Sequence, residues 1–393
     1  EPKMMKKFAI LTVVLLVFLV QATRANSQPT LPIEGNVVKA SHPLIQYIGR
    51  VSLNDIARFN YPGTTIQASF EGTSLKMICR PMTGYFMAQI DGCEPFKVGF
   101  NAPRDSVVTL ATALSQGKHH IKLMYVMEGL FRNPEFHGFV LDKGSQLVPP
   151  AALPERKIEF IGNSITCGYG VESMEMSAPF EDETENHWLT YANIVSDSLL
   201  AQHTSISRSG IGVYRNYDGP KTGSVENMPW QYEYTLFNKH DEKWDFSKYQ
   251  PQLVCINLGT NDLSTNNYDI QLYENNYRMF LKTVRSKYPA AKIVLLTGPM
   301  LGEKESSLQR AVLDRICADA RKNGFTLPDD AVVGKKGKNK KTKKSGDKDI
   351  YRFDFSFQTG DLGYGASWHP SKLQHQKMAG ELLPFLRDLM KWQ

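Results

Sequence analysis

Two patterns of apolar and polar positions divide the chain. From about residue 35 to 145, short segments of apolar residues recur at roughly ten-residue intervals, and turns that contain Gly separate them. This region has no helical repeat of useful length, and evenly spaced strands with Gly turns are typical of an antiparallel sandwich. The segments are IQASF (66–70), LKMIC (75–79), FMAQI (86–90), SVVTL (106–110) and HIKLMYV (120–126). The pattern predicts a jelly-roll β-sandwich over residues 35–145.

The second pattern follows a proline-rich linker, residues 146–156, whose clustered prolines fit neither a strand ladder nor a helix. Beyond it, apolar runs of strand length alternate with longer amphipathic segments. Strands are predicted over 157–162, 203–209, 252–259, 291–298 and 350–357, and helices over 187–200, 268–288, 306–324 and 372–392. Strands that alternate with helices predict a parallel sheet covered on both faces, over residues 157–393.

The first 25 residues have the pattern of a secretory signal peptide. Lys6 and Lys7 precede an unbroken apolar run over residues 8–20, and small and polar residues follow it. This run is short for a membrane span, which needs about 20 residues. We expect cleavage after Ala25, export to the periplasm or the medium, and no stable membrane insertion of the mature protein.

The net charge of +6 comes from two local sources. A Lys-rich stretch, residues 335–348, holds eight Lys and one Asp, and the leader holds four basic residues and one Glu. Without these two segments the chain has a net charge of −4, so no basic nucleic-acid-binding face is indicated. We expect the Lys-rich stretch to be a solvated loop; the alternative is an element that binds polyanions or a membrane surface.

The five cysteines indicate no metal centre. Cys79 and Cys93 lie in the same strand-rich region and are candidates for a disulfide, whereas Cys255 is expected to be buried in a strand. No His or Cys cluster has the spacing of metal ligands, so we predict neither a metal site nor a cofactor.

Residues with catalytic chemistry follow the predicted strands of the second region. Ligands of open parallel sheets bind beyond the carboxyl ends of the strands. These positions hold Ser164 in GNSIT, Gly210 in SGIG, Asn261 in GTND and, before the last helix, His369 in SWHP. A hydroxyl, N–H groups in a glycine turn, an amide and an imidazole are the groups that acyl transfer requires. Each segment alone also fits an ordinary turn, cap or surface residue, but their order, each at a strand end or helix start, favours catalysis.

These segments resemble the four motif blocks of the SGNH, or GDSL, hydrolases. Their finer detail, in IEFIGNSITCGYG, SRSGIGVYRNY, INLGTND and SWHPS after a jelly-roll module, resembles carbohydrate esterase family 2. That family comprises two-domain acetyl-xylan and sugar 6-O-acetyl esterases. The resemblance covers about residues 35–393. It implies an SGNH (flavodoxin-like) fold for the second region, and an acetylated polysaccharide or oligosaccharide as substrate.

The resemblance also implies roles for single residues. Ser164 is the expected nucleophile and His369 the base, and the Ser164 N–H, Gly210 and Asn261 form the oxyanion hole. Asn163 replaces the Asp of the commonest first block, with little expected consequence.

One departure affects the base. SGNH enzymes usually carry an Asp two or three residues before the His, where this chain has Ser367 and Ala366. Some members of the esterase family are similar in using a Ser-His dyad, with a backbone carbonyl that holds the imidazole. We expect this dyad, and the alternative is that Asp361 orients His369.

Three other functions compete with the esterase interpretation. Nucleotide binding is disfavoured because no Lys-Ser/Thr follows the glycines of GNSITCGYG. A non-catalytic carbohydrate-binding protein leaves Ser164 and His369 without a purpose. A lipase-like carboxylesterase is the main alternative, but no long apolar lid segment is present. Aromatic residues that suit sugar rings occur near the motifs instead: Tyr169, Tyr214, Trp230 and Trp368.

Overall fold

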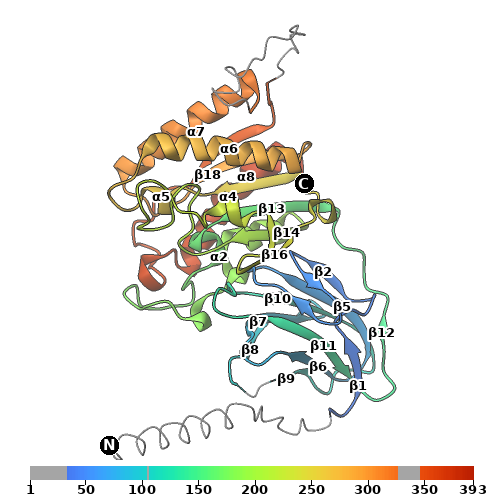
Figure 1. Ribbon diagram of the computed structural model, residues 1–393. Coiled ribbons are helices and arrows are strands. Elements are labelled where there is room, and N and C mark those ends of the chain that lie inside the picture. The colour runs from blue at the N-terminus through green and yellow to red at the C-terminus, as the bar shows by residue number, and fades with distance from the viewer. Residues whose placement is uncertain (1–32, 104–105, 326–345) are drawn as a thin grey trace, which may run out of the picture. The chain divides into compact units, whose positions relative to one another are not determined.

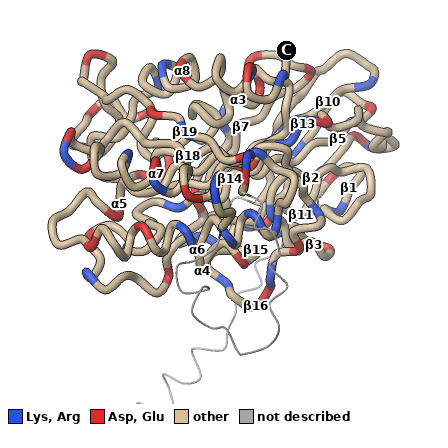
Figure 2. Tube along the Cα trace, turned by 90° about the horizontal axis from the view of Figure 1, so that it is seen from above, with Lys and Arg blue, Asp and Glu red and all other residues tan. Residues whose placement is uncertain are grey.

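The computed structural model describes residues 33–103, 106–325 and 346–393, and residues 36–393 form one unit (Figure 1). The predicted signal peptide and residues 335–345 of the Lys-rich stretch lie outside the described residues. No helix in the described part of the chain is both long and apolar enough to cross a bilayer. In the view of Figure 2, Lys and Arg are interspersed with Asp and Glu along the described chain.

The first region is a sandwich of two antiparallel sheets, which confirms the predicted fold class. One sheet has the strand order β3-β4-β11-β6-β9, with β1 paired to β11, and the other has the order β12-β5-β10-β7-β8, with β2 paired to β5. In β10, the buried side chains of His119, Ile121 and Leu123 alternate with those of His120 and Lys122, so one face of the strand lines the core. The strands are β1 (Asn36–Lys39), β2 (Gln46–Ile48), β3 (Ser52–Leu53), β4 (Ala57–Arg58), β5 (Thr65–Gly72), β6 (Leu75–Cys79), β7 (Gly84–Ile90), β8 (Phe96–Phe100), β9 (Val107–Ala111), β10 (Gly117–Tyr125), β11 (Glu135–Leu141) and β12 (Leu147–Val148).

The second region contains a parallel sheet with the strand order β14-β13-β17-β18-β19, which is the flavodoxin-like arrangement. Its strands are β13 (Arg156–Gly162), β14 (Ala201–Ser207), β17 (Leu253–Asn257), β18 (Lys292–Thr297) and β19 (Ile350–Asp354). The helices are α2 (Ser164–Cys167), α3 (Tyr191–Ser198), α4 (Met228–Gln231), α5 (Thr260–Leu263), α6 (Ile270–Lys287), α7 (Glu303–Asn323) and α8 (Lys372–Met390). The 3₁₀ turns are η1 (Asp182–Thr184), η2 (His187–Leu189), η3 (Phe246–Lys248) and η5 (Ala366–Trp368).

Helices cover both faces of this sheet because successive strand residues point to opposite sides. In β17, Leu253 and Cys255 pack with α3 and α8, whereas Val254 and Ile256 pack with α6 and α7. The apolar runs in the sequence are therefore strands buried on both faces, as expected for a parallel sheet.

Three local expectations differ from the structure. The predicted helix over 187–200 is split into η2 and α3, because the Thr190 side chain accepts from Asn193 N–H and begins a new helix. A polar hairpin of β15 (Tyr234–Leu236) and β16 (Lys239–Lys243) was not predicted. Cys79 and Cys93 are both free thiols, since Cys79 is buried in β6 while Cys93 follows β7 of the other sheet.

A buried arginine joins the sandwich to the region that follows. Arg50, between β2 and β3, donates from Nη1 to the backbone carbonyls of Tyr232 at 2.5 Å and Tyr234 at 2.9 Å. Its guanidinium also lies over four aromatic rings, at 4.9–5.7 Å from their centroids: Tyr61, Tyr232, Trp244 and Phe246. Of these rings, Tyr61 belongs to the sandwich side and the other three to the α/β region, so the cation is held by both.

Candidate active site

Ser164 lies just beyond the carboxyl end of strand β13, which pairs with β14 and β17, and it is the first residue of α2. The Asn163 side chain caps α2 by accepting from Ile165 N–H at 3.1 Å. Gly162 permits this tight turn, because a Cβ there would collide with the Thr166 hydroxyl. In the first turn of a helix the backbone N–H has no helical acceptor, so Ser164 presents both a hydroxyl and a free N–H.

His369 lies against Ser164, as the predicted dyad requires. Its Nε2 is 2.8 Å from Ser164 Oγ, and its Nδ1 is 3.1 Å from each of the backbone carbonyl oxygens of Ala366 and Ser367. Carbonyl oxygens only accept hydrogen bonds, so Nδ1 carries the proton and Nε2 is free to accept one from Ser164. The protein environment desolvates the imidazole and lowers its pKa to about 4, so that near neutral pH the ring is unprotonated at Nε2 and can accept a proton.

The two carbonyls reach His369 through an unusual backbone segment. Ser367 and Trp368 both have left-handed φ angles, of 50° and 57°. Backbone bonds hold this segment in place: Ser367 N–H donates to the carbonyl of Ala178 at 3.1 Å, and Trp368 N–H donates to that of Met176 at 3.0 Å. The loop after α2 thus supports the conformation that orients the imidazole.

Asp361 does not orient the His369 imidazole in the described structure. Its side chain is exposed and accepts a hydrogen bond from Thr359 Oγ1 at 2.8 Å. The His369 Nδ1 contacts are to backbone carbonyls, so the geometry agrees with the dyad rather than with Asp361 as the orienting group.

The three expected oxyanion donors follow three adjacent strands. Ser164 follows β13, Gly210 follows β14 and Asn261 follows β17, and these strands are neighbours in the sheet. Gly210 has a φ of 73°, which favours glycine, and among the described residues its N–H has no hydrogen-bond acceptor. Asn261 Nδ2 donates one hydrogen to the carbonyl of Ile211 at 2.8 Å, and this bond orients its second hydrogen. We call residues 209–212 the oxyanion loop.

The buried Asp262 anchors the chain that follows this loop. Its carboxylate accepts three backbone N–H bonds at 2.8–3.1 Å from Val213, Tyr214 and Arg215. Burial raises its pKa to about 6, while these N–H groups favour the charged form. The GTND segment therefore holds both the expected oxyanion donor, Asn261, and an anchor, Asp262.

The four aromatic residues predicted to bind substrate have different positions. Tyr169 stacks on the His369 ring, with centroids 4.1 Å apart, and Trp368 is exposed beside it. The prediction for Tyr214 is wrong, because its ring is buried in the core and its hydroxyl accepts from Asp269 N–H at 2.7 Å.

Among the described residues, the Trp230 ring makes no ring contact with Tyr169 or His369 at the dyad. Its ring packs on His240, at 3.9 Å between centroids, and on Tyr234, at 5.3 Å. Both partners belong to the β15–β16 hairpin, so Trp230 has a packing role there.

A cavity of about 490 Å³ lies beside the dyad. Its wall includes Tyr169, which stacks on His369, and Ser209 of the oxyanion loop. The other lining residues are Glu128, Leu130, Phe131 and Arg132 from the sandwich, and Phe180 and Asp182 from the loop after α2. Arg132 and Asp182 form an ion pair across the two regions, with Nη2 and Oδ2 2.5 Å apart.

The sandwich therefore contributes to the site, which the sequence did not indicate. The residues that line the cavity from the sandwich lie in the β10–β11 connection, where no motif marks them. The one available signal was a lone Glu within the apolar stretch YVMEGL (125–130).

Two family models match the chain. Residues 47–150 match the carbohydrate esterase 2 N-terminal model, and residues 160–376 match the GDSL-like lipase/acylhydrolase family. The two matches correspond to the sandwich and to the parallel-sheet region.

Similar proteins are known among curated sequences and solved structures. The cellulase/esterase CelE of Acetivibrio thermocellus is 34% identical over 356 residues, which are 89% of this chain but 40% of CelE. An acetylxylan esterase / glucomannan deacetylase of Cellvibrio japonicus is 28% identical over 381 residues, which are 93% of this chain and 95% of that protein. A family two carbohydrate esterase from Clostridium thermocellum, solved in complex with cellohexaose, aligns with a TM-score of 0.77 and 32% identity, over 89% of this chain and all of that one.

Proposed function

Because this chain belongs to carbohydrate esterase family 2, with a GDSL-type hydrolase domain, we propose that it removes O-acetyl groups from acetylated plant polysaccharides or sugars. The observation that carries the proposal is the 2.8 Å contact between Ser164 Oγ and His369 Nε2, next to three oxyanion donors. The names of the relatives, which include acetylxylan esterase and glucomannan deacetylase, support acetylated glycans as the substrate class.

The geometry accounts for each step of the proposed reaction. Ser164 Oγ attacks the acetyl carbonyl carbon while its proton passes to His369 Nε2. The negative oxygen that forms accepts from the Ser164 and Gly210 N–H groups and from the Asn261 amide. The intermediate collapses, and the sugar oxygen leaves with the proton from His369. Water then attacks the acetyl-serine, gives a proton to His369, and releases acetate as the Ser164 hydroxyl re-forms.

We place the sugar ring that carries the acetyl group in the cavity beside the dyad. The aromatic rings of Phe131, Phe180 and Tyr169 give the cavity an apolar wall that suits a pyranose, and the Arg132–Asp182 pair offers polar partners there. An acetyl group alone is much smaller than this cavity, so the remaining volume is available to the glycan.

Acetate release from acetylated xylan, glucomannan and simple sugar acetates tests the proposal. Wild-type protein should release acetate from at least one of these glycans. Ser164→Ala should lose about a thousandfold or more in kcat, because no acyl-enzyme forms, and its circular dichroism spectrum should match that of wild type. Near-normal turnover by Ser164→Ala, or activity confined to lipid esters, would contradict the proposal.

We also propose that the protein is exported. The proposal rests on the basic, apolar and small-residue pattern of residues 1–25. Expression of the full chain in a secreting host, followed by N-terminal sequencing of the exported protein, should give a new terminus at Asn26. Full-length protein that stays inside the cell would contradict it.

A further inference from the structure

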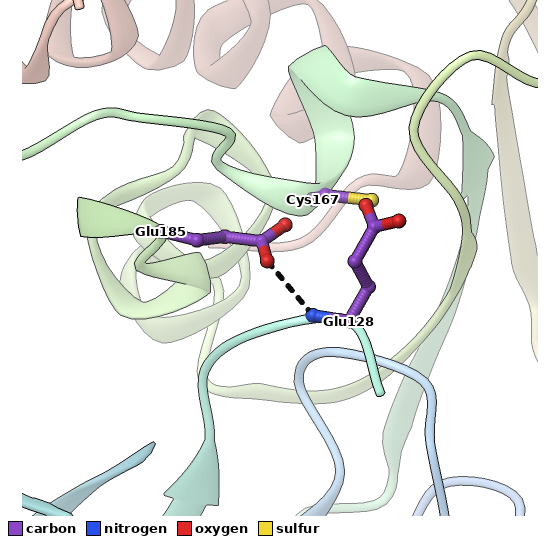
Figure 3. Close-up of side chains that lie close together, drawn as sticks. All are labelled: Glu128, Cys167 and Glu185. Carbon is purple, nitrogen blue, oxygen red and sulfur yellow. Dashed lines mark hydrogen bonds between the residues drawn. The ribbon is translucent and has the colours of Figure 1, made fainter. Parts of the chain in front are cut away.

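Two glutamates and a cysteine come together next to the oxyanion loop, and the acyl-transfer steps do not use them (Figure 3). Glu128 follows β10 of the sandwich, Cys167 ends α2, and Glu185 lies between η1 and η2. One side-chain O or S atom of each lies within 4.8 Å of those of the other two. All three residues are buried, with Glu185 and Cys167 fully inaccessible. We call Glu128 and Glu185 the carboxyl pair.

Hydrogen bonds connect the carboxyl pair to the catalytic machinery. Glu128 Oε2 accepts from the backbone N–H of Ser209 at 2.9 Å, and Ser209 precedes the oxyanion donor Gly210. Cys167 Sγ, at the end of the nucleophile helix, lies within 4.8 Å of a carboxylate oxygen of Glu128. Glu185 Oε2 in turn accepts from the backbone N–H of Glu128 at 2.9 Å. Figure 3 shows the Glu185 carboxyl group directed at Glu128. The side chain of Glu128 thereby links the sandwich to the oxyanion loop.

Two carboxyl groups this close in a buried site cannot both be ionised, because their charges repel and neither is solvated. Burial raises the pKa of both, and that of Glu185 rises well above its ordinary range because the charge of Glu128 adds to the effect. The groups that face the pair are Arg208 and the Cys167 thiol near Glu128, and Asp182 near Glu185.

These neighbours decide which member carries the charge. Arg208, the Ser209 N–H and the Cys167 thiol all favour a negative Glu128. Glu185 faces the negative Asp182 instead, and among the described residues no group donates a hydrogen bond to its Oε1. A proton on Glu185 removes both problems, because the acid O–H can donate to the Glu128 carboxylate.

We propose that Glu128 is a positioning residue for the oxyanion loop, and that one proton shared with Glu185 keeps Glu128 in place. This positioning role of Glu128 rests on the proposed esterase function, since Glu128 acts through the oxyanion donor Gly210. Loss of the shared proton at alkaline pH leaves two adjacent buried charges, and the repulsion displaces Glu128 from the Ser209 N–H.

A metal ion is the other occupant that these three side chains suggest, since thiolate and carboxylates bind Zn²⁺. Two observations favour the proton. One oxygen of each carboxyl group is already engaged by a backbone N–H, at 2.9 Å in both cases. Burial also raises the pKa of Cys167 well above its ordinary value, so the thiol keeps its proton and is a poor metal ligand.

The test measures kcat and KM on para-nitrophenyl acetate, a small ester whose hydrolysis needs the dyad and the oxyanion hole but no glycan contact. Glu128→Gln removes the negative acceptor of Ser209 N–H, and its kcat should fall by about tenfold or more at neutral pH with KM within about twofold. Glu185→Gln mimics the protonated acid and should keep kcat within about threefold at neutral pH. Glu274→Gln is the matched control and should leave kcat unchanged, because Glu274 of α6 pairs with Arg278 of α6 and with Arg315 of α7.

The pH profile separates positioning from a purely structural role. As the pH rises above neutral, wild-type kcat should decline because the shared proton is lost, whereas Glu185→Gln should not show this decline. A Glu128→Gln kcat within about twofold of wild type, or wild-type and Glu185→Gln profiles that superimpose, would overturn the proposal. Stoichiometric zinc in the purified protein, detected by elemental analysis, would overturn it as well. Inactivity of wild type on this ester would instead refute the esterase function itself.

Discussion

His369, the base of the proposed reaction, is oriented by backbone carbonyls, and this arrangement affects how activity depends on pH. The carbonyls of Ala366 and Ser367 hold the Nδ1 proton of His369 but add no negative charge beside it. Desolvation lowers the pKa of His369 to about 4, because no neighbouring carboxylate stabilises the charged imidazolium. Above this pKa the imidazole is in its active, neutral form. As the pH falls through the pKa, the ring is protonated and can no longer act as the base.

We accordingly predict that kcat/KM on a small acetate ester stays high below neutral pH and falls only near about pH 4. Ser367→Asp places a carboxylate near the imidazole and should move this acidic limb upward by about one to two pH units. Asn has nearly the same shape as Asp but no charge, so the acidic limb of the Ser367→Asn profile should lie at the same pH as in wild type. Identical limbs for Ser367→Asp and Ser367→Asn would show that no charge at this position reaches His369.

At the scale of elements, the corner between β2 and β3 carries much of the attachment of the sandwich to the rest of the molecule. Arg50 is only 1% exposed, bonds to two carbonyls beside α4, and is enclosed by four aromatic rings. Burial raises the pKa of Glu159, a carboxyl group in β13 that accepts from Tyr232 and Tyr288, and the charge of Arg50 opposes this rise. Removal of Arg50 leaves these acceptors without their cation.

Arg50→Met should lower the free energy of unfolding by about 3 kcal/mol, the range found when one member of a buried charged network is removed. Urea unfolding followed by tryptophan fluorescence measures this difference. Arg58→Met is the control, because Arg58 pairs with Glu135 near the sandwich surface and should cost less than about 1 kcal/mol. A loss for Arg50→Met no larger than that for Arg58→Met would refute the structural role of the corner.

At the scale of the whole molecule, the cavity wall comes from both regions. Phe131, in the β10–β11 connection of the sandwich, lines the cavity, yet 90% of its surface is exposed. A large apolar side chain held in water at a cavity wall is a typical contact for a ligand rather than a core residue. We therefore expect the sandwich to contact the substrate at this wall, in addition to the proposed role of Glu128 at the oxyanion loop.

Phe131→Ala should reduce kcat/KM on an acetylated polymeric glycan by about tenfold, or about 1.4 kcal/mol, through loss of the aromatic contact. Hydrolysis of a small acetate ester should not change, because the dyad and oxyanion donors are intact. Met174→Ala, which truncates a side chain with 96% exposure that does not line this cavity, should leave both activities unchanged. Equal losses on the polymer and the small ester would mean that Phe131 acts on the dyad instead of on the glycan.

Local pattern alone was enough to predict both fold classes and the four motif residues. Strand periodicity and turn residues act over a few positions, and parallel strands bring their carboxyl ends to one edge, so Ser164, Gly210 and Asn261 were expected together from the sequence. Since no carboxylate stands at positions 366 and 367, the resemblance to the esterase family implied a dyad, and the structure has backbone carbonyls at His369 Nδ1.

Tertiary packing decided which side chains near the motifs face the site and which are buried in the core. Both Tyr214 and Tyr169 lie close to a motif in the sequence. The Tyr214 ring is buried in the core, whereas the Tyr169 ring stacks on His369. Glu128 and Glu185 are 57 positions apart and belong to different regions, so no local pattern brings them together. The physical reason is that burial, and with it the protonation of a carboxyl group, depends on every element packed around it, whereas a strand or a turn depends mainly on its own residues.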